Sequence, residues 1–547
     1  MKKILALLMA MAFIVGTFAA CTPSSTTGAA YPGTPDADMI TINLGSEPPQ
    51  MNSILTTDQA SGNVLRQIMV GLVSYDQENN TVPGIAESWE YDEDTLTYTF
   101  YLREDAVWTN GTPVTAHDFV FAWTTLVTPE TASNYAEMGY IFRNGEAIHG
   151  GTMSPDALAV EAVDDYTLVF TLEKYVPYVL DQLVFYSYYP VNEEFYNTTV
   201  QADGTVLYAT DADMILTNGP FVMTEWAHED YIMLEKSETY YNADAIMLQK
   251  AKLLMLTDAN TALNMFSAGE LDMYLVSNAD HLDRFREEEY PIQSYNTGAV
   301  WYFMYNNDVP GFNNVKVRQA LTIGVDVETF VTNVRRNGAS PATGFTPPVG
   351  VAGLDNVDFR TEAGVLIERD FEAARALLEE GLAEEGIAIE DFTFSIICDD
   401  TTTSQTYAAY WQEQWRVNLG VEVTINAMPF ASRIDNMNAQ TYDVVLAGWA
   451  PDYNDPNTFL YMWTTGNGNN RTGYANPEYD ALIVAAATET DPEARLAILI
   501  EAENIITRDV PIGPLYFDAR DWVCSEKVDG IVRRSLQDLN LQWAYIV

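Results

Sequence analysis

The sequence predicts an α/β fold, and three observations support this prediction. Segments that alternate apolar and polar residues, as half-buried strands do, are followed by segments with the apolar spacing of a helix. This order of strand, helix and strand recurs toward the C-terminus, which favours parallel or mixed sheets covered by helices. The chain has 547 residues, more than one hydrophobic core usually supports, so we expect two or three structural units.

The N-terminus carries the pattern of a secretory signal. Two lysines precede an apolar run over residues 4–18, which is too short for a membrane span and is followed by small residues. The ending "FAAC" resembles a bacterial lipobox, so we expect residues 1–20 to be removed and Cys21 to receive a lipid. A Ser-, Thr-, Gly- and Pro-rich tether over residues 21–35 would follow. An ordinary signal peptide with a chance cysteine is the alternative.

The first half of the mature chain contains strand patterns around a helix pattern. Residues 39–45 alternate and end in a Pro-rich turn, and residues 95–102 and 166–172 alternate in the same way. Between the last two, Thr115 is suited to cap a helix with Asp118 three positions on. We therefore expect helix and sheet to pack together in one compact module.

The second half continues the alternation to the C-terminus. We expect strands at residues 392–398 and 421–428, and helices at residues 370–382, 407–420 and 491–510. The first and last helices each begin at an aspartate, and the middle one ends at a glycine, which are the usual caps. No repeat of solenoid period is visible.

The charge balance excludes several classes of partner. Lys and Arg number 27 against 78 Asp and Glu, giving a net charge of −51. Such a surface repels phosphate backbones and anionic lipid, so we expect no nucleic-acid binding.

The sequence offers no catalytic or metal-binding pattern. The four histidines are not spaced as zinc ligands, and no nucleophile elbow, P-loop or dinucleotide motif occurs. The run "GNGNNRTG" at residues 466–473 departs from a dinucleotide motif at Arg471. Cys398 and Cys524 have apolar neighbours, so they suit buried thiols as well as a disulfide. We expect no enzyme activity, no cofactor and no metal.

Four long blocks carry a resemblance to a known family. They lie in order at residues 84–123, 218–226, 313–331 and 448–460, the last being "GWAPDYNDPNTFL". Together they resemble extracellular solute-binding protein family 5, the oligopeptide-binding proteins of peptide ABC transporters. The resemblance extends over nearly all of the mature chain.

The resemblance implies a fold and a division into domains. The fold is a periplasmic-binding-protein-like clamshell of two lobes, type II, in a three-domain variant with an insertion in lobe one. The expected boundaries are 36–59, 204–305 and 516–547 for lobe one, 60–203 for the inserted domain, and 306–515 for lobe two.

The resemblance also implies ligand-binding residues. In peptide-binding relatives, the acid at the position of Asp452 holds the ligand's α-ammonium group; the alternative is that it caps a turn. Gly448 and Trp449 would supply main-chain groups and a wall. The other expected ligand-binding residues, each of which could instead be ordinary packing, are Tyr453, Glu47, Tyr135, Phe430 and Tyr516.

The chain also departs from the family pattern. Some relatives hold the ligand's C-terminal carboxylate with basic residues, but Leu446 and Ser404 stand at the places that we align with them. A chain with a net charge of −51 also has few cations to spare. A fixed position for the carboxylate is therefore not expected.

The function implied is reversible capture of extended oligopeptides between two lobes. The protein would be a lipoprotein outside the bacterial cell membrane, a monomer that delivers peptides to an ABC permease with its ATPase subunits. A solute binder of the same fold for an oligosaccharide, a metal chelate or a signalling peptide is the alternative. An enzyme is a third class, since the pairs Asp399 with Asp400 and Asp452 with Asp455 could imitate a glycosidase's carboxylates.

Overall fold

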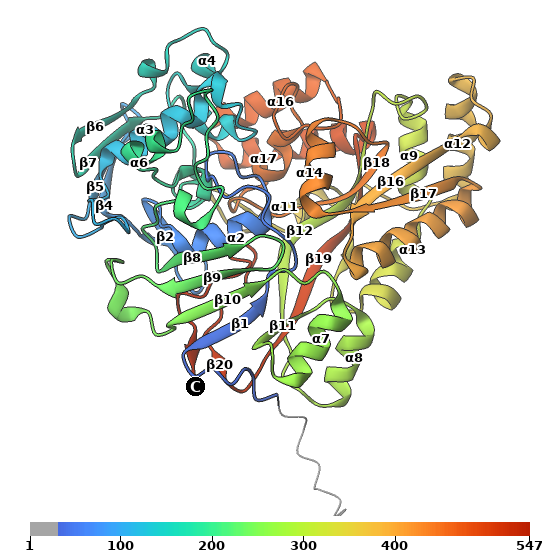
Figure 1. Cartoon of the computed structure of the whole chain (residues 1–547). Helices are drawn as coiled ribbons and strands as arrows, with labels where there is room; N and C mark the ends of the chain where they lie inside the picture. The colour runs from blue at the N-terminus through green and yellow to red at the C-terminus, as the bar shows by residue number, and fades with distance from the viewer. Residues whose placement is uncertain (1–30) are drawn as a thin grey trace, which may run out of the picture.

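The structure is a computed structural model in which residues 31–547 are described (Figure 1). The expected signal peptide, the lipid site Cys21 and most of the tether lie outside these residues. Within them, no helix combines the length and apolarity needed to cross a bilayer. Tyr31 is 4% exposed and packs against Phe266 and Phe285, while Thr34 donates to Asp272. Residues 31–35, expected as tether, therefore pack against the folded part.

A mixed sheet of eleven strands runs through the molecule and confirms the α/β class (Figure 1). β16 pairs in parallel with β17 and β18, and β1 pairs in parallel with β10 and β11, while the other pairings are antiparallel. In spatial order they are β17 (Glu422–Met428), β16 (Thr393–Asp399), β18 (Val444–Trp449), β12 (Gln293–Tyr305), β19 (Ile512–Cys524), β11 (Met273–Val276), β1 (Met39–Asn43), β10 (Lys250–Leu254), β9 (Tyr231–Lys236) and β8 (Phe221–Ala227), with β13 (Ser340–Pro341) beside β19.

The long strands β12 and β19 connect the two ends of this sheet. Each has 13 residues, and they pair antiparallel with register shifts after Asn296 and Trp301. β12 pairs on its other edge with β18, and β19 pairs on its other edge with β11. The two ends of the sheet are therefore joined through this strand pair.

A second sheet of four strands forms a separate layer in the first half. Its order is β4 (Ala86–Asp92), β5 (Thr97–Leu102), β7 (Thr167–Thr171) and β6 (Val160–Asp164), with α3 (Ala116–Val127) packed against it. The expected helix cap is confirmed, since Asp118 accepts from the main-chain N–H of Thr115 at 2.8 Å. Trp123 of α3 is fully buried and stacks on Phe142.

Helices cover the end of the large sheet that β16 and β17 form. α12 (Phe371–Glu384) begins at the expected cap Asp370, and α13 (Thr402–Leu419) begins five residues earlier than expected and ends at Gly420 with φ +74°. Figure 1 shows both on the far side of the molecule from the four-stranded sheet. The other long helices are α2 (Gln59–Ile68), α7 (Ala259–Ala268), α8 (Ala279–Glu287), α9 (Val315–Ile323), α14 (Phe430–Asn438), α16 (Pro477–Thr488) and α17 (Pro492–Asp509).

Short elements complete the chain. They are the helices α4 (Gly145–His149), α5 (Val179–Gln182), α6 (Glu193–Thr198), α10 (Val327–Thr329), α11 (Phe359–Ala363) and α15 (Asn457–Leu460), and the strands β2 (Val73–Tyr75), β3 (Thr81–Pro83), β14 (Gly350–Val351), β15 (Leu354–Asp358), β20 (Val528–Asp529) and β21 (Tyr545–Ile546).

Cys398 and Cys524, the two cysteines among residues 31–547, are free thiols. Burial raises the pKa of Cys398 to about 11 and that of Cys524 to about 12, so neither thiol is ionised near neutral pH. The choice left open by the sequence is therefore resolved in favour of unpaired thiols.

Candidate functional site

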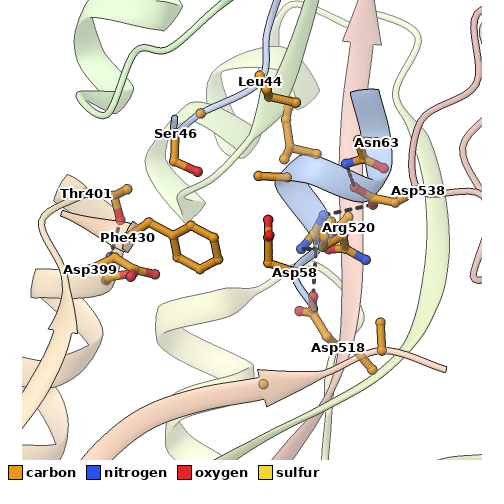
Figure 2. Close-up of a pocket in the computed structure, with 18 of the residues that line it drawn as sticks. Leu44, Ser46, Asp58, Asn63, Asp399, Thr401, Phe430, Asp518, Arg520 and Asp538 are labelled. Carbon is orange, nitrogen blue, oxygen red and sulfur yellow. Dashed lines mark hydrogen bonds and ion pairs between the residues drawn. The ribbon is translucent and has the colours of Figure 1, made fainter. Parts of the chain in front are cut away.

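A cavity of about 410 Å³ lies where the two ends of the large sheet meet the module that contains the four-stranded sheet. Its walls include the loop after β1, the start of α2, the end of β18 and the start of α14. In Figure 2, Phe430 projects from one wall toward Asp58 on the opposite wall. This volume is typical of a ligand site.

Acidic and basic side chains line the cavity in equal number, although the whole chain is strongly acidic. Of the residues that the structure describes, five aspartates and five arginines line it, and no Lys, Glu or His does. They are Asp58, Asp399, Asp452, Asp518 and Asp538, and Arg66, Arg335, Arg433, Arg471 and Arg520. In a chain of net charge −51, this balance sets the cavity apart from the rest of the protein and suits a ligand with both charge signs.

Strand β18 brings the motif at residues 448–460 to the cavity. It pairs with β12 along its length, but β16 pairs with it only at Val444 and Val445. The edge of residues 447–449 that continues the β16 side therefore has no strand partner. Gly448 is exposed there, and a Cβ atom on it would stand 3.1 Å from the ring of Trp301.

Trp449 forms part of the same wall. Its side chain is 8% exposed, and its indole Nε1 is buried without a hydrogen-bond partner among residues 31–547. A buried indole N–H usually has an acceptor, so this donor is left unsatisfied behind the cavity wall.

Asp452 presents a carboxylate to the cavity. The hydroxyl of Tyr135 donates to both of its oxygens, each at 3.2 Å, and no Lys, Arg or His among the described residues forms an ion pair with it. Burial raises the pKa of Asp452 to about 8, while the Tyr135 hydrogen bond and the charge of Arg66 act in the opposite direction. Asp452 therefore lacks a cationic partner among the described residues, and a cationic ligand would favour its ionised carboxylate.

The nearby turn is held by Asp455 and not by Asp452. Asp455 is fully buried, forms a bidentate ion pair with Arg495 at 2.7 and 2.8 Å, and accepts from the main-chain N–H of Asn457 at 2.9 Å. The carboxylate of Asp452 accepts from a side chain of a distant segment instead. The role of turn cap, which was the alternative for Asp452, is therefore performed by Asp455.

Neither acidic pair offers two free carboxylates. Asp455 is engaged by Arg495, and Asp399 accepts from Arg433 Nε at 2.5 Å. In each pair, one carboxylate already neutralises an arginine. The geometry therefore gives no support to the glycosidase-like alternative.

Five of the eight residues expected to bind ligand line the cavity: Asp452, Trp449, Gly448, Tyr135 and Phe430. Glu47, Tyr453 and Tyr516 are absent from its wall.

Each of these three side chains has other partners. Glu47 accepts from the main-chain N–H of Glu229 at 2.8 Å and lies 2.7 Å from His228 Nδ1. Tyr453 stacks on Tyr178 with ring centroids 4.7 Å apart. Tyr516 is 1% exposed and stacks beside Trp301. These contacts agree with the alternative that Glu47, Tyr453 and Tyr516 serve the packing of the protein.

Part of the charged lining forms a network that is already satisfied (Figure 2). Arg520 donates to Asp538 at 2.8 Å, and Asn63 donates to the other oxygen of Asp538 at 2.9 Å. Burial alone would raise the pKa of Asp538, but Arg520 and Arg533 hold it well below its usual range. Arg520 also lies beside Asp518, which pairs with Arg335.

The cavity contains cations, although the chain has few to spare and lacks them at the two positions aligned with the family's basic residues. Leu446 is buried away from the cavity, and Ser404 lines it without charge, but the arginines arrive from other elements. Arg433 comes from α14, and Arg471 comes from the loop between α15 and α16. An alignment with the family's basic positions does not find them. The one sequence signal was Arg471 itself, a cation within a Gly- and Asn-rich run.

Comparison with known proteins identifies a family and relatives that this chain resembles. Residues 80–471 match a family described as bacterial extracellular solute-binding proteins, family 5 Middle. The dipeptide-binding protein DppE of Bacillus subtilis is 34% identical over 506 residues, covering 92% of this chain and 91% of that protein.

Two solved structures are similar over nearly their whole length. The substrate-binding domain of an oligopeptide ABC transporter from Bacillus anthracis matches with a TM-score of 0.89 and 31% identity, covering 94% of this chain and 99% of that chain. Listeria monocytogenes OppA bound to peptide matches with a TM-score of 0.87 and 28% identity, covering 93% and 99%. The periplasmic-binding-protein-like fold expected from the sequence is therefore confirmed.

Proposed function

The chain belongs to family 5 of the bacterial extracellular solute-binding proteins, and we propose that it is the peptide-capturing component of an ABC importer. Relatives that it matches over more than nine tenths of their length are named for dipeptide or oligopeptide binding, and one solved neighbour holds a peptide. The proposal transfers this ligand class to the cavity.

The observation that carries the proposal is the unpaired carboxylate of Asp452 beside an open strand edge. An α-ammonium group on Asp452 would supply the missing cation, and exclusion of water on closure would strengthen the ion pair. The peptide's main chain would then lie along residues 447–449 as an added strand. Main-chain pairing tolerates many side chains, which a general peptide binder needs.

We propose that the domain boundaries follow the expected ranges, with the hinge at β12 and β19. Residues 300–305 of β12 pair with β18 on one side, and residues 521–524 of β19 pair with β11 on the other, so this strand pair links the two ends of the sheet. Contacts across the cavity include Tyr135 with Asp452, and Asn457 Nδ2 donating to the Tyr178 hydroxyl at 3.0 Å. A peptide that touches both sides would favour the closed arrangement through its higher affinity for it.

The remaining features of the proposal follow from the family and the sequence. The protein would act as a monomer outside the cytoplasm, anchored through a lipid on Cys21, and would deliver peptides to a membrane permease with its ATPase subunits. It would bind and release its ligand without chemistry, so no catalytic residue or cofactor is assigned.

The test is the identity of whatever co-purifies with the protein. We expect mass spectrometry of the heat-released ligand to show a set of short peptides with free N-termini. A glycan or a metal chelate would overturn the peptide assignment in favour of another solute. An empty preparation is then incubated with a degenerate peptide library, and failure to retain any peptide would equally contradict the proposal.

A further inference from the structure

Arg471 is a buried cation of the cavity whose charge has no acidic partner among residues 31–547. Its side chain is 5% exposed, and no carboxylate among residues 31–547 forms an ion pair with it. Its Nη2 donates to Thr57 Oγ1 at 3.3 Å and to Asn469 Oδ1 at 3.4 Å, both long bonds to neutral acceptors. Its Nε is buried with no partner in the same part of the chain.

The other arginines of the cavity differ from Arg471. Arg335, Arg433 and Arg520 each form an ion pair with an aspartate. Arg66 forms none, but it is only partly buried, so water can solvate its charge. Arg471 alone among these five combines burial with the lack of an acidic partner.

The loop that carries Arg471 is built to hold it in place. Asn470 Nδ2 donates to the carbonyl oxygens of Trp463, Thr464 and Tyr474 at 3.3, 3.0 and 2.8 Å. The Tyr442 hydroxyl donates to the carbonyl oxygen of Arg471 itself at 2.5 Å. The guanidinium is thus kept at the cavity by a fixed backbone, and it cannot easily turn out to solvent.

Such an arrangement is unfavourable in the empty protein. A buried guanidinium loses its hydration and regains little from two long neutral hydrogen bonds. Burial lowers the pKa of Arg471, and the charge of Arg433 acts in the same direction. In a chain with 78 acidic residues, the absence of one here indicates that the counter-ion arrives with the ligand.

Arg433 adds a second cation to the same region. Its side chain is 7% exposed, its Nε is engaged by Asp399, and its guanidinium lies 5.0 Å from the centre of the Phe430 ring. Its Nη2 has no hydrogen-bond partner among the residues described. Arginine matches a carboxylate with two parallel N–H donors, and Arg433 and Arg471 both line the cavity, so the cavity presents two guanidiniums suited to that group.

We propose that Arg471, assisted by Arg433, binds a carboxylate of the captured peptide. This inference rests on the proposed function and adds a second fixed point to the one at Asp452. Tyr135 donates to Asp452, and Asn469 of the Arg471 loop donates from Nδ2 to the carbonyl oxygen of Asn134 at 3.2 Å, so the two subsites meet at the segment of Asn134 and Tyr135. The carboxylate therefore belongs to an acidic side chain close to the peptide's N-terminus or to the C-terminus of a short peptide.

The test is a binding cycle between protein and peptide. The wild-type protein is loaded from a degenerate peptide library, and the peptide that it retains is identified by mass spectrometry. Analogues of that peptide are made in which each carboxylate is neutralised singly, Glu to Gln, Asp to Asn, or the C-terminus to its amide. Their affinities are measured by calorimetry for wild type, for Arg471→Gln and for Arg508→Gln, an exposed arginine outside the cavity.

We expect that neutralising one particular carboxylate of the peptide lowers its affinity for wild type but not its affinity for Arg471→Gln. Neutralising it should weaken binding to wild type about tenfold or more, as should Arg471→Gln alone, and the two changes together should cost little more than either. Which analogue behaves so identifies the source of the carboxylate. The control variant Arg508→Gln should bind every analogue as wild type does.

The melting temperature of the empty protein gives an independent readout. Because Arg471 is unpaired, Arg471→Gln should leave this temperature unchanged or raise it. A lower melting temperature together with an equal loss of affinity for every analogue would show that Arg471 only supports the fold, and would overturn the inference. If the library yields no peptide, the proposed function fails; if peptides bind but the cycle is additive, only the carboxylate site fails.

Discussion

Peptide binding should release a proton below pH 8, and Asp452 is its source. Burial raises the pKa of Asp452 from 3.8 to about 8 in the empty cavity, so at pH 6 this carboxyl is almost wholly protonated. An α-ammonium group would hold it ionised in the complex. The complex then carries one proton less than its free components, and the peptide's affinity should rise about tenfold for each pH unit between pH 6 and pH 8.

The rise should stop near pH 8 for two reasons. The carboxyl of Asp452 is by then ionised in the empty protein as well, and the peptide's own α-amino group, with a pKa of about 8, begins to lose its charge. The affinity of a free peptide should therefore have a maximum near this pH.

The same shift predicts the pH dependence of folding. The pKa of Asp452 is higher in the folded empty protein than in the unfolded chain, so its contribution to stability is complete below pH 3.8. That contribution is lost as pH rises toward about 8, and it changes no further above that value. Asp452→Asn should remove this part of the pH dependence.

Calorimetry in buffers of different ionisation enthalpy measures the protons released. We expect about one proton per peptide at pH 6 for wild type, and close to none for Asp452→Asn or for an N-acetylated peptide. Equal proton release by wild type and Asp452→Asn would refute the reasoning. So would an affinity that does not change between pH 6 and pH 8.

Two further predictions concern the turn and the strand beside Asp452. Asp455→Asn leaves the Arg495 guanidinium buried without its ionised partner, so the free energy of unfolding from urea titrations should fall by about 3–5 kcal/mol. Glu413→Gln removes an exposed ion pair and should leave the urea midpoint unchanged. Equal effects of the two substitutions would contradict the burial argument. Gly448→Leu places a side chain in the cavity against Trp301, so peptide affinity should fall about tenfold or more in a variant that still unfolds cooperatively. Undiminished affinity would exclude this strand edge from the ligand site.

The elements of the fold were largely predictable because local signals and tertiary packing agree. Asp370 and Gly420 are found as the caps that the sequence predicted, and Trp123 is buried on the expected helix face. The start of α13 was misplaced because its first turn, "TTSQT", lacks the apolar spacing that marks a helix. Its cap Thr401 was the available signal, since its side chain accepts from the N–H of Ser404.

The site was less predictable than the fold. Asp452 and Phe430 could be singled out because the family resemblance gives their neighbourhood. Arg433 and Arg471 could not, because their roles depend on two segments that are distant from Asp58 in the chain and meet it only across the folded cavity. Glu47 illustrates the opposite case, since its segment reaches the cavity at Ser46 while its own carboxylate turns to His228.

The central claim is that an acid at the cavity wall holds the amine of a guest peptide. It is tested most directly by comparing a free peptide with its N-acetylated form on wild type and on Asp452→Asn. We predict that acetylation weakens binding to wild type about 30-fold or more, and that Asp452→Asn loses most of this difference. Equal affinities of wild type for the two peptides would contradict the claim.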